Sequence, residues 1–330
     1  MANFSKQICV FLSLFLAFSL ALDHNEPGFL KRQHSLIKPY TGSSASIPNW
    51  DYRDATMITN SFVRLTPDHQ GKRGSLWNRI PVYLRDWELI MSFKIHGGGR
   101  TLAADGFAIW YTKQRMEPGP VFGSRDQFSG LGVFLDTYKN GPQAVTFPFI
   151  TAMVNNGSMN YDHAGDGRQN SIGSCLASFR NKDFETSISI RYVKSRLTVS
   201  LNVDDGMDWR ECFDVGGVTL PVGYFFGVSA ATGDLADNHD IVGVKLYEID
   251  AHRPQGEDDG WGTAVPSVSF FKPPLDNTDE SAAGGFRNTA MSGFKIFLIF
   301  ICALLGLGVC VVVGFVVFQK RQEQSRKRFY

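Results

Sequence analysis

The middle of this chain, from about Ser44 to Arg253, consists of short apolar or alternating runs closed by glycine, asparagine or aspartate. Such runs are typical of β-strands, because successive side chains of a strand point to opposite faces of a sheet. No segment of this region carries an apolar stripe at helical spacing over more than two turns. We therefore expect an all-β domain, a sandwich of antiparallel sheets. The clearest expected strands are Trp87–Ile95, Gly106–Tyr111, Gly130–Leu135, Thr186–Tyr192, Leu197–Val203 and Tyr224–Ala230.

Two local patterns inside this domain carry further expectations. Asp205-Gly206 directly follows one expected strand, and this dipeptide is typical of a hairpin turn. The tryptophans could stack on a sugar, but at β spacing we expect them in the core or on a sheet face. They are Trp50, Trp77, Trp87, Trp110 and Trp209.

The two ends of the chain predict its compartment. Lys6 precedes the apolar run Ile8–Leu20, so residues 1–21 resemble a secretory signal peptide. A second apolar run, Ile296–Phe318, contains no charge and is long enough to cross a bilayer, which predicts a transmembrane helix over residues 294–318. The basic tail that follows, residues 319–330, is expected in the cytoplasm. The chain is thus predicted to be a type I single-pass membrane protein.

Between these ends we expect one folded lumenal domain, residues 44–253, preceded by a short N-terminal segment, residues 22–43. Residues 254–293 are rich in Pro, Gly, Asp and Ser and show little periodicity, so they are predicted to form a lumenal stalk. Val268, Phe270 and Phe271 are the apolar residues of this stalk that could dock elsewhere.

The cysteines agree with a lumenal location. Cys9 belongs to the signal peptide and Cys302 and Cys310 to the apolar span, which leaves Cys175 and Cys212 in the lumen. An oxidising lumen favours pairing these two as a structural disulfide. The formal net charge of +1 gives no reason to expect a nucleic-acid partner. Asn156-Gly157-Ser158 is a glycosylation sequon, so Asn156 is a candidate glycan acceptor.

Two segments predict a site for a hard cation. The run Gly132–Asn140 delivers Asp136 at a strand end and offers the amide of Asn140 four residues later. In Tyr161–Gly167, acidic residues stand between glycines, so Asp166 could supply a second carboxylate. Calcium (Ca2+) prefers such carboxylate, amide and carbonyl oxygens. Each segment taken alone also fits an ordinary turn.

A second acidic stretch is open to two interpretations. Asp237, Asn238 and Asp240 could hold another cation, but a solvated acidic loop is the simpler expectation.

Several motifs together resemble a known family. Leu131–Asn140 with Ala104–Trp110 resembles the legume-type lectin signature. Further motifs resemble the vesicular integral-membrane lectins of the early secretory pathway, the animal branch of that family: Trp87-Glu88, Met116–Gly123, Met153–Ser158, Tyr161–His163 and Thr232–Leu235. The order of signal peptide, stalk, span and short tail is also similar.

This resemblance implies a concanavalin-like sandwich that binds high-mannose glycans of secretory glycoproteins in a calcium-dependent way. It implies calcium ligands at Asp136, the backbone carbonyl of Tyr138, Asn140 and Asp166. It implies carbohydrate contacts from Asp105, Asn140, His163, Gly233, Asp234 and Leu235. A cis peptide bond before Asp105 is implied as well.

The chain departs from the family pattern at two positions. Gly71 stands where a serine hydroxyl often contacts the sugar. Phe134 replaces the glutamate that holds a transition metal in plant lectins, so we expect no manganese site.

The tail suggests traffic between endoplasmic reticulum, intermediate compartment and Golgi. Phe329-Tyr330 resembles an export signal read by vesicle coat proteins, and Lys327-Arg328 resembles a dibasic retrieval signal. A plain positive-inside cluster would explain the charges but not the aromatic end.

The sequence bears on two other function classes. A glycoside hydrolase on the same fold needs two carboxyl groups about 5 Å apart, which a strand can supply at alternating positions. The stretch Glu248–Arg253 comes close to that pattern but has Arg253 where an acid should stand, and no other expected strand offers a pair of glutamates. We therefore expect no enzyme. A protein-binding escort that does not need glycans remains the alternative.

Overall fold

A computed structural model describes residues 28–41, 46–99, 105–140, 148–204, 208–251 and 262–269. The predicted signal peptide, transmembrane span and cytoplasmic tail lie outside these ranges. None of the helices within the ranges is long and apolar enough to cross a membrane.

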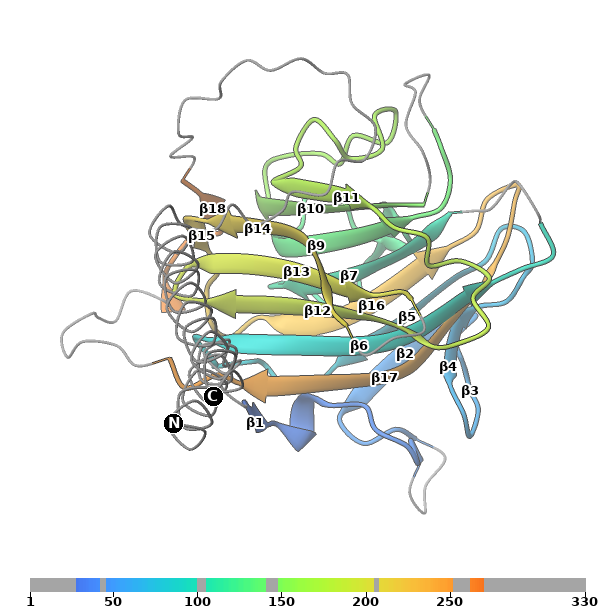
Figure 1. Ribbon diagram of the computed structural model, residues 1–330, viewed down its shortest axis with the longest axis horizontal. Coiled ribbons are helices and arrows are strands. Elements are labelled where there is room, and N and C mark those ends of the chain that lie inside the picture. The colour runs from blue at the N-terminus through green and yellow to red at the C-terminus, as the bar shows by residue number, and fades with distance from the viewer. Residues whose placement is uncertain are drawn as a thin grey trace, which may run out of the picture. The chain divides into compact units, whose positions relative to one another are not determined.

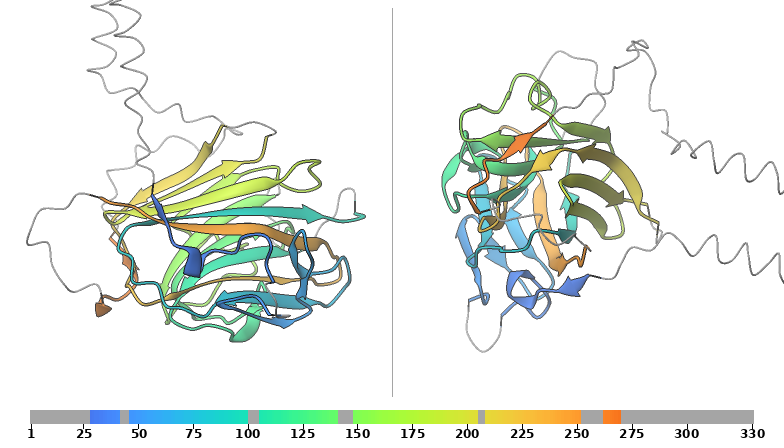
Figure 2. Two further views of the ribbon diagram at one scale, coloured as in Figure 1. Left: turned by 90° about the horizontal axis from the view of Figure 1, so that it is seen from below. Right: turned by 90° about the vertical axis from the view of Figure 1, so that its left-hand side faces the viewer.

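The described part consists mainly of two antiparallel sheets stacked face to face (Figure 1 and Figure 2). One sheet has eight strands in the order β14-β13-β12-β6-β17-β4-β3, with β1 paired to β17. Its strands are β1 (Phe29–Leu30), β3 (Met57–Ile58), β4 (Val63–Thr66), β6 (Trp87–His96), β12 (Thr186–Val193), β13 (Arg196–Asn202), β14 (Arg210–Gly216) and β17 (Asn238–Glu248).

The other sheet has seven strands in the order β11-β10-β9-β7-β16-β5-β2. They are β2 (Trp50–Asp54), β5 (Arg73–Asn78), β7 (Gly106–Thr112), β9 (Ser129–Asp136), β10 (Phe149–Asn156), β11 (Gly173–Leu176) and β16 (Phe225–Ala231). The smaller elements are a 3₁₀ turn, η1 (Arg32–His34), β8 (Pro118–Val121), and the pair β15 (Val218–Thr219) and β18 (Ser267–Val268).

All six expected strands are present, each within a residue or two of its predicted bounds, and the antiparallel sandwich is confirmed. β13 and β14 pair as a hairpin, as Asp205-Gly206 predicts. The turn itself, residues 205–207, lies outside the described ranges.

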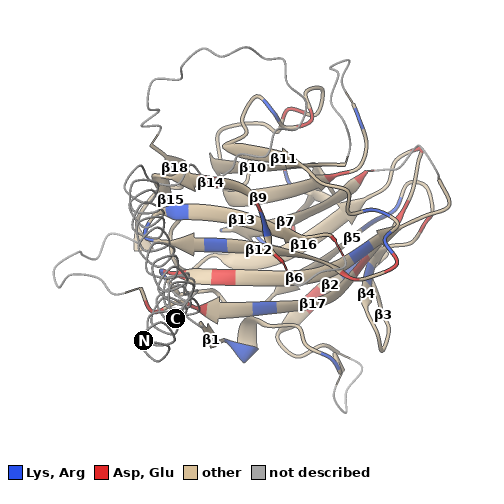
Figure 3. Ribbon diagram, viewed as in Figure 1, with Lys and Arg blue, Asp and Glu red and all other residues tan. Residues whose placement is uncertain are grey.

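Strand β6 explains how the main core forms. Its residues alternate strictly between buried and half-buried positions from Trp87 to His96, which is the pattern of a strand with one face against a core. The Trp87 ring reaches across to the seven-stranded sheet, with centroids 5.3 Å from Tyr111 and 4.9 Å from Phe226. The outward positions of the eight-stranded sheet include charged residues (Figure 3).

A second apolar cluster is separate from the main core and contains side chains of the seven-stranded sheet. Phe134 of β9 packs on Trp110 of β7, with ring centroids 5.5 Å apart. Loop residues Phe122, Phe128 and Tyr161 cover them. All eight residues of β9 are therefore buried, and the loop that contains Tyr161 is fixed against the sheet.

Chain segments on either side of the predicted domain 44–253 also join the packed body. Leu30 of β1 pairs with Tyr247, and Leu36 is 2% exposed in the core. Val268 of β18 pairs with Val218 and packs against the main core, so this residue of the predicted stalk does dock. Phe270 and Phe271 lie outside the described ranges.

The disulfide Cys175–Cys212 is present, as expected. It joins β11 and β14, the edge strands of the two sheets, and thus holds the sandwich together on that side. Four of the tryptophans are buried, as predicted. Trp209 is 43% exposed and lies outside the strands, so the expectation of a core or sheet-face position was wrong there. It directly precedes β14 and so stands outside the strand alternation that the prediction used.

Candidate functional site

Strand β9 ends at Asp136, a residue that is 2% exposed. Phe134, two residues earlier, points to the same face of the strand and anchors it in the outer apolar cluster. The backbone N–H of Tyr138 donates a 2.9 Å hydrogen bond to Asp136 Oδ1. The chain thus turns back over its own carboxylate as soon as the strand ends.

Asp166 reaches the same place from the loop that follows β10. Its Oδ1 accepts hydrogen bonds from the backbone N–H of Asn140 at 2.9 Å and from Asn140 Nδ2 at 3.1 Å. Asp166 adopts a left-handed backbone with φ of 55°. The next residue must be glycine, because a Cβ on Gly167 would lie 2.5 Å from the Tyr161 ring. The structure therefore joins the two segments in which the sequence predicted cation ligands.

Asp105 stands beside this pair at the start of β7. Gly106 lies opposite Asp136 in the sheet register, and the N–H of Thr137 donates to the Asp105 carbonyl at 3.0 Å. A Cβ added to Gly233 would lie 3.5 Å from both Asp105 carboxylate oxygens. Asp105 and the Gly233 loop therefore meet at one edge of the acidic cluster.

The loop Gly233–Leu235 is held by the turn that precedes β5. The Gly71 N–H donates to the Gly233 carbonyl at 3.1 Å, and Gln70 Nε2 donates to the Asp234 carbonyl at 2.5 Å. Gly233 and Asp234 are exposed, and Leu235 is half-buried. The tip of the loop is thus open to solvent, while the carbonyls of Gly233 and Asp234 are held by hydrogen bonds from the turn.

The electrostatics of the cluster are unfavourable without a cation. Burial raises the pKa of Asp136 well above its ordinary value, and the charges of Asp166 and Asp105 raise it further against the opposing Tyr138 hydrogen bond. Burial and the nearby Asp234 raise the pKa of Asp105 to about 6. In the described part of the chain none of these carboxylates forms an ion pair with Lys, Arg or His. Buried charges without partners are costly, so the cluster favours a bound cation.

The donor set fits calcium. Asp136, Asp166, the Asn140 amide and the Tyr138 carbonyl are all oxygen donors, which hard cations prefer. The hydroxyls of Tyr161 and Thr137 are also buried and have no hydrogen-bond partner. Nowhere in the described ranges do three His, Cys, Asp or Glu side chains gather as a metal group; two of the four predicted ligands are an amide and a backbone carbonyl.

Tyr161 is a residue whose part in the site was not predicted. The centroid of its ring lies 4.8 Å from that of Phe134 and 4.9 Å from that of His163, with the latter pair in an edge-to-face arrangement. It therefore supports the exposed His163 on one side and borders Gly167, next to Asp166, on the other. Its position next to Asp162 in sequence was the available signal, but only the fold shows that one ring contacts both parts of the site.

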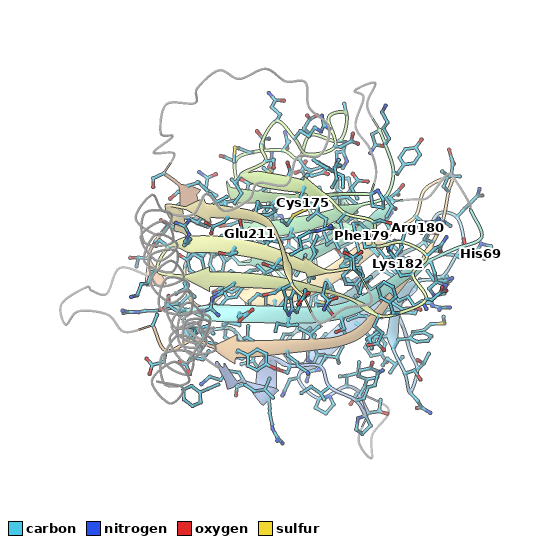
Figure 4. The ribbon with its side chains drawn as sticks, viewed as in Figure 1. His69, Cys175, Phe179, Arg180, Lys182 and Glu211 are labelled. Atoms are coloured by element: carbon cyan, nitrogen blue, oxygen red, sulfur yellow. A yellow bond between two sulfur atoms is a disulfide. The ribbon has the colours of Figure 1, made fainter. Side chains whose placement is uncertain are left out.

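The structure overturns both interpretations of the second acidic stretch. Asp237 is fully buried. The guanidinium of Arg180, labelled in Figure 4, donates two 2.7 Å hydrogen bonds to its carboxylate. Asp240 is bonded by Arg64 at 2.7 and 2.8 Å. These acids are neither a solvated loop nor a free cation site, because arginines from distant strands and loops neutralise them.

The structure bears only in part on the glycosylation sequon and on the expected cis peptide bond before Asp105. Asn156 is exposed at the end of β10, and its Oδ1 accepts a 2.6 Å hydrogen bond from Ser158 Oγ, which keeps it a candidate glycan acceptor. The peptide bond before Asp105 involves Ala104, which lies outside the described ranges.

Comparison with known proteins gives a consistent result. The sequence model of the legume-like lectin family matches residues 28–255. The chain is 52% identical over 305 residues to the mouse (Mus musculus) vesicular integral-membrane protein VIP36, covering 91% of this chain and 85% of that protein. It is 48% identical over 307 residues to the human (Homo sapiens) VIP36-like protein, covering 92% and 86%.

Solved structures agree with the sequence relatives. The crystal structure of the VIP36 exoplasmic/lumenal domain in its Ca2+/Man2-bound form is similar to this chain with a TM-score of 0.71 and 51% identity. That similarity covers 74% of this chain and 99% of the VIP36 domain. The chain therefore belongs to the legume-like lectin family, and its sandwich is the fold of that family.

Proposed function

We propose that this protein is a calcium-dependent lectin that binds mannose-containing glycans of secretory glycoproteins. The observation that carries the proposal is the buried carboxylate cluster of Asp136 and Asp166. Within the described ranges it has no Lys, Arg or His partner, and it shares an edge with Asp105 and Gly233. Relatives support it, since the VIP36 lumenal domain has been solved in Ca2+/mannose-bound and metal-free forms.

The residues of the site divide into two groups. Asp136, the Tyr138 carbonyl, Asn140 and Asp166 would hold calcium, which supplies the positive charge that the buried carboxylates lack. Asp105, Asn140, His163 and the loop Gly233–Leu235 would then meet the sugar hydroxyls. Asn140 belongs to both groups, and its hydrogen bonds to Asp166 orient it for both. Exposed backbone at Gly233 allows close approach of a flat sugar face.

The cellular role follows from the ends of the chain. We infer a lumenal lectin domain, a membrane span over residues 294–318 and a tail whose Lys327-Arg328 and Phe329-Tyr330 signals contact vesicle coat proteins. Such a protein would carry high-mannose glycoproteins between endoplasmic reticulum and Golgi.

Glycan-array binding of the full chain in detergent tests this function. With calcium, the protein should bind high-mannose glycans, and a chelator should abolish that binding. Asp136→Asn should lose both calcium and glycan binding. Asp214→Asn is the matched control, because Asp214 lies on β14 of the other sheet and pairs with Arg196. Strong glycan binding in the presence of chelator would refute the proposal.

The glycan-independent escort remains the second candidate because of Gly71. Its backbone has a φ of 63°, and a Cβ added there would meet nothing within 4 Å. No side chain therefore occupies the place where the resemblance expects a hydroxyl. A protein that loads calcium and binds no glycan would favour the escort.

A further inference from the structure

A groove of about 650 Å³ lies away from the candidate lectin site. It is lined by the ends of strands β4, β6 and β17 and by the segment 181–185. These strands belong to the eight-stranded sheet, whereas Asp105 and Asp136 belong to β7 and β9 of the other sheet or their ends. A volume of this size falls in the range of ligand sites, about 300–1,000 Å³.

The floor of the groove is a row of charged residues across three strands. Asp240 of β17 lies opposite Arg64 of β4 on one side and opposite Lys94 of β6 on the other. The Asp240 side chain is 4% exposed and is bonded by Arg64 and by His96 Nε2 at 3.0 Å. Its negative charge is therefore covered. The basic partners remain partly exposed, 20% for the Arg64 side chain and 35% for that of His96.

Two lysines in the groove have no acidic partner among the residues that the structure describes. Neither Lys94 nor Lys182 forms an ion pair within the described ranges. Lys182 Nζ lies 5.7 Å from the centroid of the Phe184 ring. Figure 4 labels Lys182, which belongs to the segment after β11. At the rim, the Glu185 carboxylate already pairs with Lys38 Nζ at 4.0 Å. Of the three acids that line the groove, only Asp183 is then left without a basic partner among the described residues. The groove thus offers more positive than negative charge to a ligand.

Charge spacing and apolar lining identify the ligand class. Arg64 and Lys94 are separated by one intervening strand, which is roughly 10 Å, and Lys94 and His96 are roughly 7 Å apart along β6. One carboxylate does not span these distances, whereas acidic residues at alternating positions of an extended peptide do. Phe62 and Phe184 add apolar surface between the charges. We infer that this groove binds an acidic, extended segment of a partner protein, independently of calcium and glycan.

Fluorescence anisotropy tests the inference on the full chain in detergent, with chelator present. The probe is a labelled six-residue peptide that alternates Glu with Val and Phe, compared with the same peptide carrying Gln for Glu. The Glu peptide should bind, and its affinity should fall steeply with added salt. Lys94→Glu combined with Lys182→Glu should weaken binding at least about tenfold, a loss of about 1.4 kcal/mol.

Lys245→Glu is the matched control, because Lys245 is exposed on the same strand β17 but outside the groove. It should leave peptide binding intact. Asp136→Asn should also leave it intact, which separates this groove from the lectin site. Equal binding of the Gln peptide, or unchanged binding in the double variant, would overturn the inference. Preferential binding of a sulfated polysaccharide fragment would overturn it too, since that assigns the groove to another class of molecule.

Discussion

His239 makes the folded domain sensitive to acid. It lies on β17 with no exposed surface, and its Nδ1 is 2.6 Å from Thr66 Oγ1. Its Nε2 is buried without a partner. Its pKa is lowered to about 3, chiefly by burial; Asp240 opposes this shift, and His96 and Arg180 add to it.

The magnitude follows from the difference between the folded and unfolded states. The folded pKa is about 3 and the reference value is 6.5. The unfolded chain therefore binds the proton more tightly, so the free energy of unfolding falls as pH drops below 6.5 and levels off below 3. At pH 5 the unfolded histidine is protonated by about 30 to 1, while the folded one stays neutral. This group alone should lower stability by about 2 kcal/mol between pH 7 and pH 5.

Urea unfolding followed by tryptophan fluorescence, with chelator present, measures this effect. His239→Gln should remove about 2 kcal/mol of the pH dependence between pH 7 and pH 5 relative to the original protein. Ile241→Ala is the control: it makes a cavity at a fully buried position of the same strand and should lower stability equally at both pH values. An unchanged pH slope in His239→Gln would refute the assignment of a neutral, buried histidine.

Two further changes test the buried Arg180–Asp237 ion pair and the Cys175–Cys212 disulfide. Arg180→Leu leaves the buried carboxylate of Asp237 unpaired and should lower the free energy of unfolding in urea by about 3–5 kcal/mol. The control is Arg196→Leu, which breaks a pair whose arginine side chain is 62% exposed and should lower it by under about 1 kcal/mol. Equal losses in the two variants would contradict this ranking. Replacing Cys175 and Cys212 by alanine opens a link across 37 residues and should lower stability by about 4 kcal/mol; no loss relative to the oxidised protein would contradict a structural role.

Much of the fold was predictable because its rules are local. Strand β6 alternates buried and half-buried residues over its whole length, and a period of two can be recognised without any neighbour. The Asp136–Asn140 loop was recognisable for the same reason, because its ligands are only four residues apart. The disulfide required only a count of lumenal cysteines.

Other features depended on contacts between distant segments. Asp237 was predicted as solvent-exposed, yet Arg180, 57 residues earlier, buries and neutralises it. Nothing in the local sequence of either residue indicates this pair. The position of Tyr161 between His163 and Asp166 likewise depends on its packing against Phe134 of β9.

The sequence by itself determined the class of fold, the family and the residue types available to a calcium site, because strand periodicity and short motifs are local properties. Only the tertiary structure decided which carboxylates are left without a counter-charge. Asp136 and Asp166 meet in a buried cluster that no basic side chain of the described ranges reaches, whereas Asp240 meets Arg64 across a sheet register. Charge pairing depends on distance in space, and the fold sets that distance for residues far apart in the chain.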